Sequence, residues 1–356
     1  MTSHSHALIT LLSFFPLFTF FTLTAGEEQS DSLRVQHQRI MFWNVENAFW
    51  PADDSLREDD EFTPEGIRHW TRSRLRQKLL QLTRVIVAAG DGMAPMIVGL
   101  AEVEGDSAMH YWTHNTPLWD QHYNYIVSEG PDVRGIQTAL LYQPTDFKLI
   151  HADFHRVVMP EGVRPTRDVL HAAGRVVSGD TLDVIVCHLP SRLGGAKQTQ
   201  AAREAAQRTV MHVADSVRYR RRSPNIVIMG DMNDFAKRSK AWWGKDYVNL
   251  MIPLQKSLKL HPSAYGSHKY QGEWVFLDQF IVFSPSSPSL QALSALYGGS
   301  NPSNFSNPRV FHLPFMLIED SSHLGHRPKR SYYGYQYEGG YSDHLPILLD
   351  FDVFFR

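Results

Sequence analysis

The sequence YSDHLPILLDF at residues 341–351 places Asp343 and His344 directly before a strongly apolar run that predicts a β-strand. Five similar motifs precede it along the chain: NVEN at 44–47, AEVE at 101–104, CHLPS at 187–191, GDMND at 230–234 and LDQF at 277–280. Each motif puts carboxylate, amide or imidazole groups at the end of, or beside, an apolar run of strand-forming residues. We therefore expect six strand ends to deliver polar side chains to one shared site.

Apolar runs predict nine strands, at residues 40–45, 96–103, 123–129, 137–143, 147–154, 181–189, 225–232, 275–283 and 345–355. The clearest helical pattern lies at 71–89, where leucine, valine and isoleucine recur at helical spacing among arginines and lysines, and a second helix is expected at 197–221. Strands that alternate with long helices, together with strands at hairpin-like spacing, favour a mixed α/β fold with more than one sheet layer.

Length and composition indicate one large folded unit. The chain has 356 residues, of which 43% are hydrophobic, and the polar motifs extend from Asn44 to His344. Its 35 basic and 37 acidic residues give a net charge of −2, so a polyanionic substrate would have to be recognised locally. The single cysteine, Cys187, excludes both an internal disulfide framework and a tetrathiolate zinc site. We expect a monomer.

The first 25 residues have the layout of an export signal, with an apolar run over 7–24 and a small residue, Ala25, before an acidic stretch. Cleavage near Ala25 would give a periplasmic or secreted protein. Retention as an uncleaved membrane anchor is the alternative, because the run approaches the roughly 18 residues that span a bilayer. A short linker at 26–37 and one domain at 38–356 complete the expected organisation.

Glu102 follows the apolar run at 96–101, and a carboxylate at a strand end can bind a hard cation such as Mg²⁺, which prefers oxygen ligands. An ordinary surface carboxylate is the alternative. Asn44 and Glu46 follow Trp43, where a buried strand seldom carries polar groups, although a turn-capping asparagine explains this equally well.

Asp231 and Asn233 follow the run at 225–229, and their spacing points both side chains to the same side of an extended chain. The carboxylate could orient or deprotonate a water molecule, and the amide could hold a phosphoryl oxygen. An Asx turn that leaves the strand is the alternative for this motif alone.

His188 and His344 both lie beside apolar strand residues. A lone histidine in such a place is usually structural, but two of them favour phosphate chemistry, because protonated imidazoles stabilise the charge of a transferring phosphoryl group. Such a histidine needs a carboxylate that keeps it oriented and protonated. Asp278 is the expected partner, since an unpaired carboxylate in the strand at 275–283 would be costly to bury.

Together, the six motifs resemble those of the endonuclease/exonuclease/phosphatase superfamily, the DNase I-like metal-dependent phosphoesterases, in the same order along the chain. The resemblance covers about residues 38–354. It implies a DNase I-like α/β fold: a four-layer α/β/β/α sandwich, in which two mixed β-sheets are flanked by helices and the site lies where the strand ends converge.

The resemblance also implies how a metal ion and the phosphate are bound. Glu102 corresponds to the main ligand of Mg²⁺, with Mn²⁺ or Ca²⁺ as alternatives, and Asp343 would lie close to the metal. Asn44 corresponds to the amide beside the metal and the phosphate. Glu46 is a candidate second ligand, although the family often has Asp or Gly at this position. Whether one or two ions bind stays open.

The catalytic roles follow from the same resemblance. Asp231 would position or deprotonate the attacking water, and Asn233 would hold that water and the phosphate. His188 corresponds to a phosphate-binding histidine, and His344, paired with Asp278, corresponds to the second one. Which of Asp231 and His344 acts as the general base stays open. The family often has Asn before the first histidine, whereas this chain has a cysteine there, so one supporting hydrogen bond is in doubt.

Other residues bear on the substrate. Arg134 and Arg192 border site motifs and could donate bidentate hydrogen bonds to phosphate oxygens, with ordinary surface arginines as the alternative. Arg164 and Arg167 are expected to be surface arginines. Residues 285–340 are expected to form an excursion beside the site. Its aromatic residues could stack bases or touch lipid: Phe305, Phe311, Phe315, Tyr332, Tyr333, Tyr335 and Tyr337.

The leading hypothesis is an exported, Mg²⁺-dependent hydrolase of phosphodiesters, with DNA or RNA as the first substrate to test. A phosphomonoesterase or a sphingomyelinase-type phospholipid hydrolase with the same site is the alternative. A catalytically silent binding protein with this fold is a more distant one. Contact with a membrane is expected only if the leader is retained or the substrate is a lipid.

Overall fold

Two six-stranded mixed sheets lie face to face in the computed structural model, which describes residues 34–239, 242–261, 263–283 and 305–355. The first sheet has the order β13 (Phe305–Val310), β18 (Ile347–Phe355), β1 (Arg34–Ala48), β2 (Ile97–Val103), β4 (Gln137–Tyr142), β3 (Asn124–Val127). The second has the order β5 (Lys148–His155), β6 (Val169–Arg175), β7 (Thr181–His188), β8 (Ile226–Asp231), β12 (Asp278–Phe283), β9 (Tyr247–Asn249). Within these sheets β1 and β2 pair parallel, as do β7 and β8, and the remaining pairs are antiparallel.

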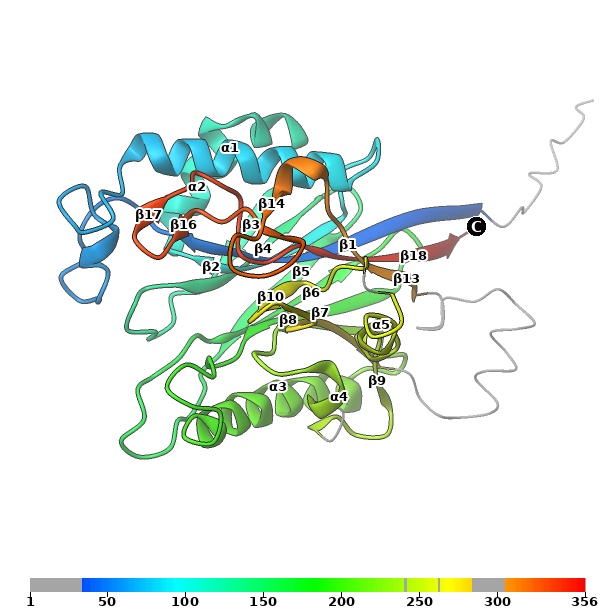
Figure 1. Cartoon of the computed structure of the whole chain (residues 1–356). Helices are drawn as coiled ribbons and strands as arrows, with labels where there is room; N and C mark the ends of the chain where they lie inside the picture. Colours follow the sequence, from blue (N-terminus) through cyan, green and yellow to red (C-terminus); the bar gives the residue numbers. More distant parts are fainter. Residues whose placement is uncertain (1–33, 240–241, 262, 284–304, 356) are drawn as a thin grey trace, which may run out of the picture. The chain divides into compact units, whose positions relative to one another are not determined.

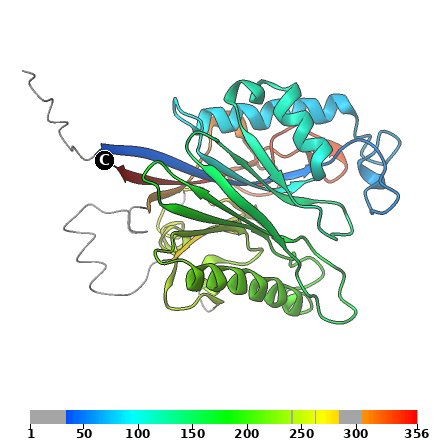
Figure 2. The ribbon, with the colours of Figure 1, turned by 180° about the vertical axis from the view of Figure 1, so that it is seen from behind.

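Helices cover the outer face of each sheet. Helices α1 (Arg72–Ala89) and α2 (Gly105–Asn115) lie on the first sheet, and α3 (Gln200–Arg220) lies on the second, as Figure 1 shows and Figure 2 repeats from behind. The short helices α4 (Ala236–Ser239) and α5 (Met251–Ser257) lie between β8 and β12 along the chain. The α/β/β/α order confirms the predicted four-layer sandwich.

The two long helices form where their sequence patterns predict them. Helix α1 begins after Thr71, whose side-chain oxygen accepts a hydrogen bond from the backbone N–H of Arg74 at 3.3 Å, which caps the first turn. Leu75, Leu79 and Leu82 then recur on one face and are buried against the first sheet. The predicted ends of both helices differ from the observed ones by three residues at most.

Strand β6 was missed because its sequence, VLHAAGR, is poor in the large β-branched side chains that mark strands. The structure explains its small residues. A Cβ atom added at Gly174 would lie 2.4 Å from the ring of Phe147, which packs over this strand from the core between the sheets. Strand β13, also missed, contains Pro308, which is tolerated because β13 is the edge strand of its sheet.

Alternation along the strands decides which side chains face the space between the sheets. In β1, Met41 and Trp43 pack toward α1, whereas Ile40 and Phe42 belong to the core between the two sheets. Because side chains alternate with period two, Asn44 continues the inner row. The same count along β7, β8 and β12 places polar residues at one end of the inner rows: Asn44, His188, Asp231 and Asp278.

The described part of the predicted excursion, 305–340, is more ordered than its composition suggests. It supplies β13 and two small hairpins, β14 (Leu317–Glu319) with β15 (His326–Pro328), and β16 (Tyr332–Tyr333) with β17 (Gln336–Tyr337). The expectation that its aromatics face a substrate is wrong for Tyr332, which is buried against Phe62 and Trp70. Tyr333 and Tyr335 are the exposed members, at 42% and 66%.

The predicted leader at 1–25 lies outside the described residues, as does most of the linker. The described residues begin at Arg34, in β1. Among the described helices, none combines the length and the apolar character that a membrane crossing requires.

We expect Gly230→Ala to destabilise the fold. A Cβ atom at Gly230 would lie 2.1 Å from the carbonyl oxygen of Cys187, because the two residues are register partners in β7 and β8. Backbone atoms cannot move aside cheaply, so the free energy of unfolding should fall by about 1–3 kcal/mol. Gly244→Ala is the matched control, since its Cβ would meet nothing closer than 3.8 Å. Equal urea midpoints for the two variants would contradict this account.

Candidate active site

The side-chain amide of Asn44 links the two sheets at the polar end of their inner faces. Its Nδ2 atom donates to Oε1 of Glu102 at 3.2 Å and to Oδ2 of Asp231 at 3.1 Å. Glu102 belongs to β2 of the first sheet, and Asp231 ends β8 of the second. Asn44 and Asp231 are each only 2% exposed. The structure therefore brings together the three polar groups that the motifs at 44, 102 and 231 were predicted to supply.

Unusual backbone conformations orient several of these residues. Glu102 has a φ of 68°, and the register of β2 with both neighbouring strands shifts at this position, as at a β-bulge. Glu46, Asn47 and Asn233 also have positive φ values, of 54°, 52° and 47°. Left-handed backbone at residues other than glycine costs free energy and concentrates at functional sites. The bulge turns Glu102 out of the strand alternation, and its Oε2 accepts from the backbone N–H of Asn47 at 3.0 Å.

His344 and Asp278 form the predicted pair. Nδ1 of His344 lies 2.7 Å from Oδ2 of Asp278, and its Nε2 lies 3.8 Å from Oδ2 of Asp231. The hydroxyl of Ser342 fixes this loop, because it donates to the carbonyl of Asn44 at 2.7 Å and accepts from the backbone N–H of His344 at 3.0 Å. Burial alone lowers the pKa of His344, but the charge and hydrogen bond of Asp278 raise it well above its usual range. The Asp278 carboxylate therefore favours the protonated form of His344.

His188 lies in the same cluster, but its pKa is shifted in the opposite direction. Its Nε2 is 3.6 Å from Oδ2 of Asp231 and 3.9 Å from Oε1 of Glu102, and its Nδ1 is buried without a hydrogen-bond partner. Burial, reinforced by the positive charge of Arg167, lowers the pKa of His188 well below its usual range. The two imidazoles, which were expected to behave alike, thus have pKa values shifted in opposite directions.

Asp231 is the residue on which both rings converge. Burial, with a smaller effect of the Asp278 charge, raises the pKa of Asp231 to about 7, although His344 opposes the shift. The backbone N–H of Asn233 donates to Oδ1 of Asp231 at 2.8 Å, while its side-chain amide donates to the carbonyl of Leu189 at 2.8 Å. Asn233 therefore holds Asp231 and the His188 loop in place. A carboxylate that is ready to accept a proton is suited to deprotonating water.

Arg330 occupies a place that the sequence did not indicate. Its guanidinium donates from Nε to Glu46 at 3.1 Å and from Nη2 to Asp343 at 2.5 Å. Lys78, which is 2% exposed, adds an ammonium group 3.9 Å from Glu46 and donates to the hydroxyl of Ser331. Burial opposes the ionisation of Asp343, but Arg330 holds its pKa far below the usual range. Glu46 and Asp343, both predicted near a metal, are thus joined by a guanidinium.

One sequence signal could have revealed part of this arrangement. Lys78 lies between Leu75 and Leu79 on the buried face of α1, where a lysine needs a partner. Arg330 carried no such signal, because its neighbours are other surface-like residues of the excursion. His268 is a further neighbour of the site, since its strand, β10 (His268–Tyr270), bridges to His344, with ring centroids 4.6 Å apart.

Glu102 and Asp231 together fit a divalent cation. The Glu102 side chain is 15% exposed, and none of the ion pairs among the described residues joins it or Asp231 to a lysine or arginine. Two carboxylates that share one amide donor leave negative charge that a hard, oxygen-preferring cation would neutralise. Asp231, Asp278 and His344 also offer ligand atoms within 4.8 Å of one another, as do His268, Asp343 and His344. Oxygen donors dominate the site.

The predicted arginines have different positions. The Arg134 side chain is 45% exposed, beside Asp132 at 3.7 Å, and close enough to help depress the pKa of His188. Arg192 donates to Asp234 at 3.2 Å, outside the cluster. Arg164 is an exposed partner of Glu58, as expected. The expectation of an exposed Arg167 is wrong, because this residue is 5% exposed and donates to Asp132 and to the carbonyl of Leu189.

The class of protein that this fold and site define is the metal-dependent phosphoesterases. A family profile described as the endonuclease/exonuclease/phosphatase family matches residues 39–352. The chain belongs to that family, and the prediction of a metal-dependent ester hydrolase is confirmed.

Solved structures with the same fold have low sequence identity. An endonuclease/exonuclease/phosphatase family protein from Bacteroides thetaiotaomicron is 14% identical, with a TM-score of 0.53, and the match covers 91% of this chain and 97% of that one. The human nocturnin catalytic domain with bound sulfate is 16% identical, with a TM-score of 0.51 and coverages of 90% and 97%. A mannosyl-6-phosphatase from Bacteroides thetaiotaomicron is 14% identical, with a TM-score of 0.51 and coverages of 88% and 98%. No curated protein sequence matches this chain.

We expect Arg330→Gln to destabilise the protein, because Glu46 and Asp343 would remain buried side by side without their guanidinium. Removing one partner from a buried ion pair should lower the free energy of unfolding by about 3 kcal/mol. Arg164→Ala, which breaks an exposed pair, should change it by less than about 1 kcal/mol. Chemical unfolding measures both. Addition of Mg²⁺ should raise the melting temperature more in Arg330→Gln than in the wild type. If Arg330→Gln has the same free energy of unfolding as the wild type without added metal, the guanidinium does not stabilise the buried carboxylates.

Proposed function

We propose that this protein is a Mg²⁺-dependent phosphodiesterase, with nucleic acid as the first substrate class to test. The observation that carries the proposal is the Asn44 amide, which holds the carboxylates of Glu102 and Asp231 together beside one cationic imidazole. Oxygen ligands of this kind favour Mg²⁺ over softer ions. Bound at Glu102, the ion would supply a Lewis acid for the negative charge that develops on phosphate oxygens.

Side chains of the site activate the water molecule and stabilise the charge of the transition state. Asp231 orients a water molecule in line with the scissile P–O bond and accepts its proton as the oxygen attacks phosphorus. The new P–O bond forms as the ester P–O bond breaks, and the leaving oxygen takes up a proton. Protonated His344, held by Asp278, donates a hydrogen bond to a phosphoryl oxygen whose negative charge grows in the transition state. Asn44 holds both carboxylates in register for this step.

Charge favours a diester at the reacting phosphorus. A diester carries one negative charge there, whereas a monoester carries close to two at neutral pH. His344 lies 3.8 Å from Asp231 and favours its protonated form, whereas burial lowers the pKa of His188, and Arg330 already pairs with Glu46 and Asp343. A monoester would require more positive charge than these groups offer. The monoesterase stays the alternative, because one protein of similar fold is described as a mannosyl-6-phosphatase.

A cavity of about 130 Å³ next to the cluster suits the flanking part of a substrate. His268, Arg330 and Asp343 line its inner side, and Tyr333 and Arg327 line its outer side, with the guanidinium of Arg327 4.4 Å from the centre of the Tyr333 ring. An exposed aromatic ring can stack on a nucleobase. This favours a nucleic acid over a sphingomyelin-type lipid.

Hydrolysis assays test the proposal. The purified protein should cleave a bis(nitrophenyl) phosphate and plasmid DNA with Mg²⁺ and lose activity in EDTA, with weaker cleavage of the mono-ester and of sphingomyelin. Asp231→Asn and Asp278→Asn should each lower kcat about 10²–10⁴-fold, the usual size of an acid–base contribution. Asp352→Asn is the matched control, because Asp352 also pairs with a histidine, His37, but at the surface.

Two results would contradict parts of this proposal. Equal background rates for wild type and Asp231→Asn on every substrate would refute hydrolysis at this site. A preference for the mono-ester would refute the diesterase while leaving the hydrolase intact.

We also propose that the protein is exported and that its leader is removed near Ala25. The support is the apolar run at 7–24 followed by small and acidic residues. Mass spectrometry of protein recovered from the periplasm or the medium should give a mature chain that starts near Gly26. An intact Met1 in the membrane fraction would instead establish an uncleaved anchor.

A further inference from the structure

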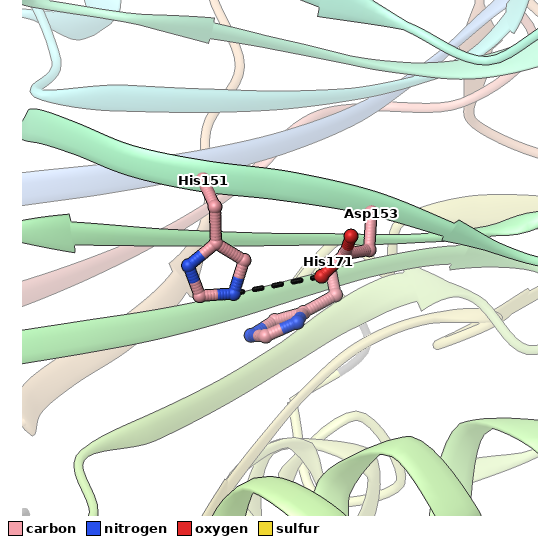
Figure 3. Close-up of side chains that lie close together, drawn as sticks. All are labelled: His151, Asp153 and His171. Carbon is pink, nitrogen blue, oxygen red and sulfur yellow. Dashed lines mark ion pairs between the residues drawn. The ribbon is translucent and has the colours of Figure 1, made fainter.

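A second group of potential metal ligands lies on the α3 side of the second sheet, away from the active site. Figure 3 shows the imidazoles of His151 and His171 and the carboxylate of Asp153 turned toward one another from neighbouring strands. Each offers one ligand atom, and these atoms all lie within 4.8 Å of one another. Nε2 of His151 is 3.5 Å from Oδ2 of Asp153.

Strand geometry explains the convergence. His151 and Asp153 are two residues apart in β5, so their side chains point to the same face. His171 is the register partner of Asp153 on β6, which places it directly across from that carboxylate. The site therefore joins the edge strand of the sheet to its neighbour.

One ring nitrogen of His171 is held by a hydrogen bond, which leaves the other nitrogen available to a ligand. Its Nε2 lies 2.9 Å from Oδ1 of Asp183, and Arg221 donates to both oxygens of that carboxylate at 2.9 Å. An ionised carboxylate only accepts, so Nε2 carries a hydrogen, and in the neutral ring Nδ1 then has the free lone pair. The side chain of His171 is 1% exposed, and its Nδ1 has no hydrogen-bond partner. A buried, unpaired nitrogen is unfavourable unless something binds it.

We propose that His151, Asp153 and His171 form a binding site for a borderline divalent cation of the Zn²⁺ class. Two imidazoles and one carboxylate, with a carboxylate behind one ring, match the ligands and the supporting contacts of zinc sites. Tetrahedral Zn²⁺ at 2.0–2.1 Å from its ligands separates them by about 3.3 Å, so a modest rotation of these side chains closes the site. His151 and Asp153 are 41% and 55% exposed, which leaves the fourth position to water.

Two neighbouring side chains bear on whether the cluster can hold a cation. The imidazole of His155 on β5 lies 6.2 Å from that of His171, ring centre to ring centre, and its buried Nε2 has no partner. The nearby guanidinium of Arg221 is neutralised by Asp183. The site is independent of the catalytic proposal, since the two use different residues.

Zinc titration of the whole protein tests the inference. Protein stripped with EDTA and then supplied with excess Mg²⁺, which occupies oxygen sites, should bind one Zn²⁺ per chain by calorimetry. His151→Ala and Asp153→Ala should each weaken this binding at least about tenfold, in line with losses at zinc sites. Both side chains are half-exposed, so the variants should fold, and their Mg²⁺-dependent hydrolysis should equal that of the wild type. Bound Co²⁺ should show the visible absorption of a tetrahedral site.

His261→Ala is the matched control, because it removes an exposed histidine far from this cluster along the chain and should leave Zn²⁺ binding unchanged. His344→Ala, which removes a catalytic imidazole, should also leave it unchanged. Wild-type affinity in His151→Ala and Asp153→Ala, or no Zn²⁺ bound by the wild type in excess Mg²⁺, would overturn the proposal. Loss of Zn²⁺ in His344→Ala alone would assign the ion to the active site and overturn it as well.

Discussion

The hydrogen bonds of the Asn44 amide are the constraint on which the active site depends. Stacked sheets lie about 10 Å apart, a space that apolar side chains fill along most of their length. At one end the inner rows finish in polar groups, and the single Nδ2 atom of Asn44 reaches carboxylates from both sheets. This bond fixes the distance between Glu102 and Asp231, so the sandwich itself sets the geometry of the chemistry.

The distribution of positive charge around this amide separates structural carboxylates from reactive ones. Glu46 and Asp343 share Arg330, and Asp278 holds His344. Glu102 and Asp231 pair with no lysine or arginine among the described residues. The guanidinium and ammonium groups near the site thus pair with the structural carboxylates and not with the reactive ones. Negative charge remains at the two carboxylates that a metal ion and a water molecule would use.

Period-two alternation made much of this site predictable from the sequence. The inner rows of β7, β8 and β12 lead directly to His188, Asp231 and Asp278, and the order of the motifs identified the fold. The approach of Arg330 depends on the path of the segment between two hairpins, 284 residues from Glu46 along the chain, and no local pattern encodes that path. The burial of Arg167 was missed for a related reason, since its partners, Asp132 and the carbonyl of Leu189, belong to other segments. Strand β6 was hidden by small residues that exist to accommodate Phe147.

The two buried histidine–carboxylate pairs differ in the charge that surrounds the carboxylate. Asp278 has no arginine partner among the described residues, and one of its oxygens lacks any hydrogen bond, so its negative charge acts on His344 and keeps that ring cationic. Asp183 already carries the guanidinium of Arg221, so it offers His171 an acceptor oxygen with little unbalanced charge. A cationic ring stabilises a phosphate, whereas a ring with a free lone pair binds a metal ion. The two pairs therefore differ in the arginine that lies behind Asp183 and that Asp278 lacks.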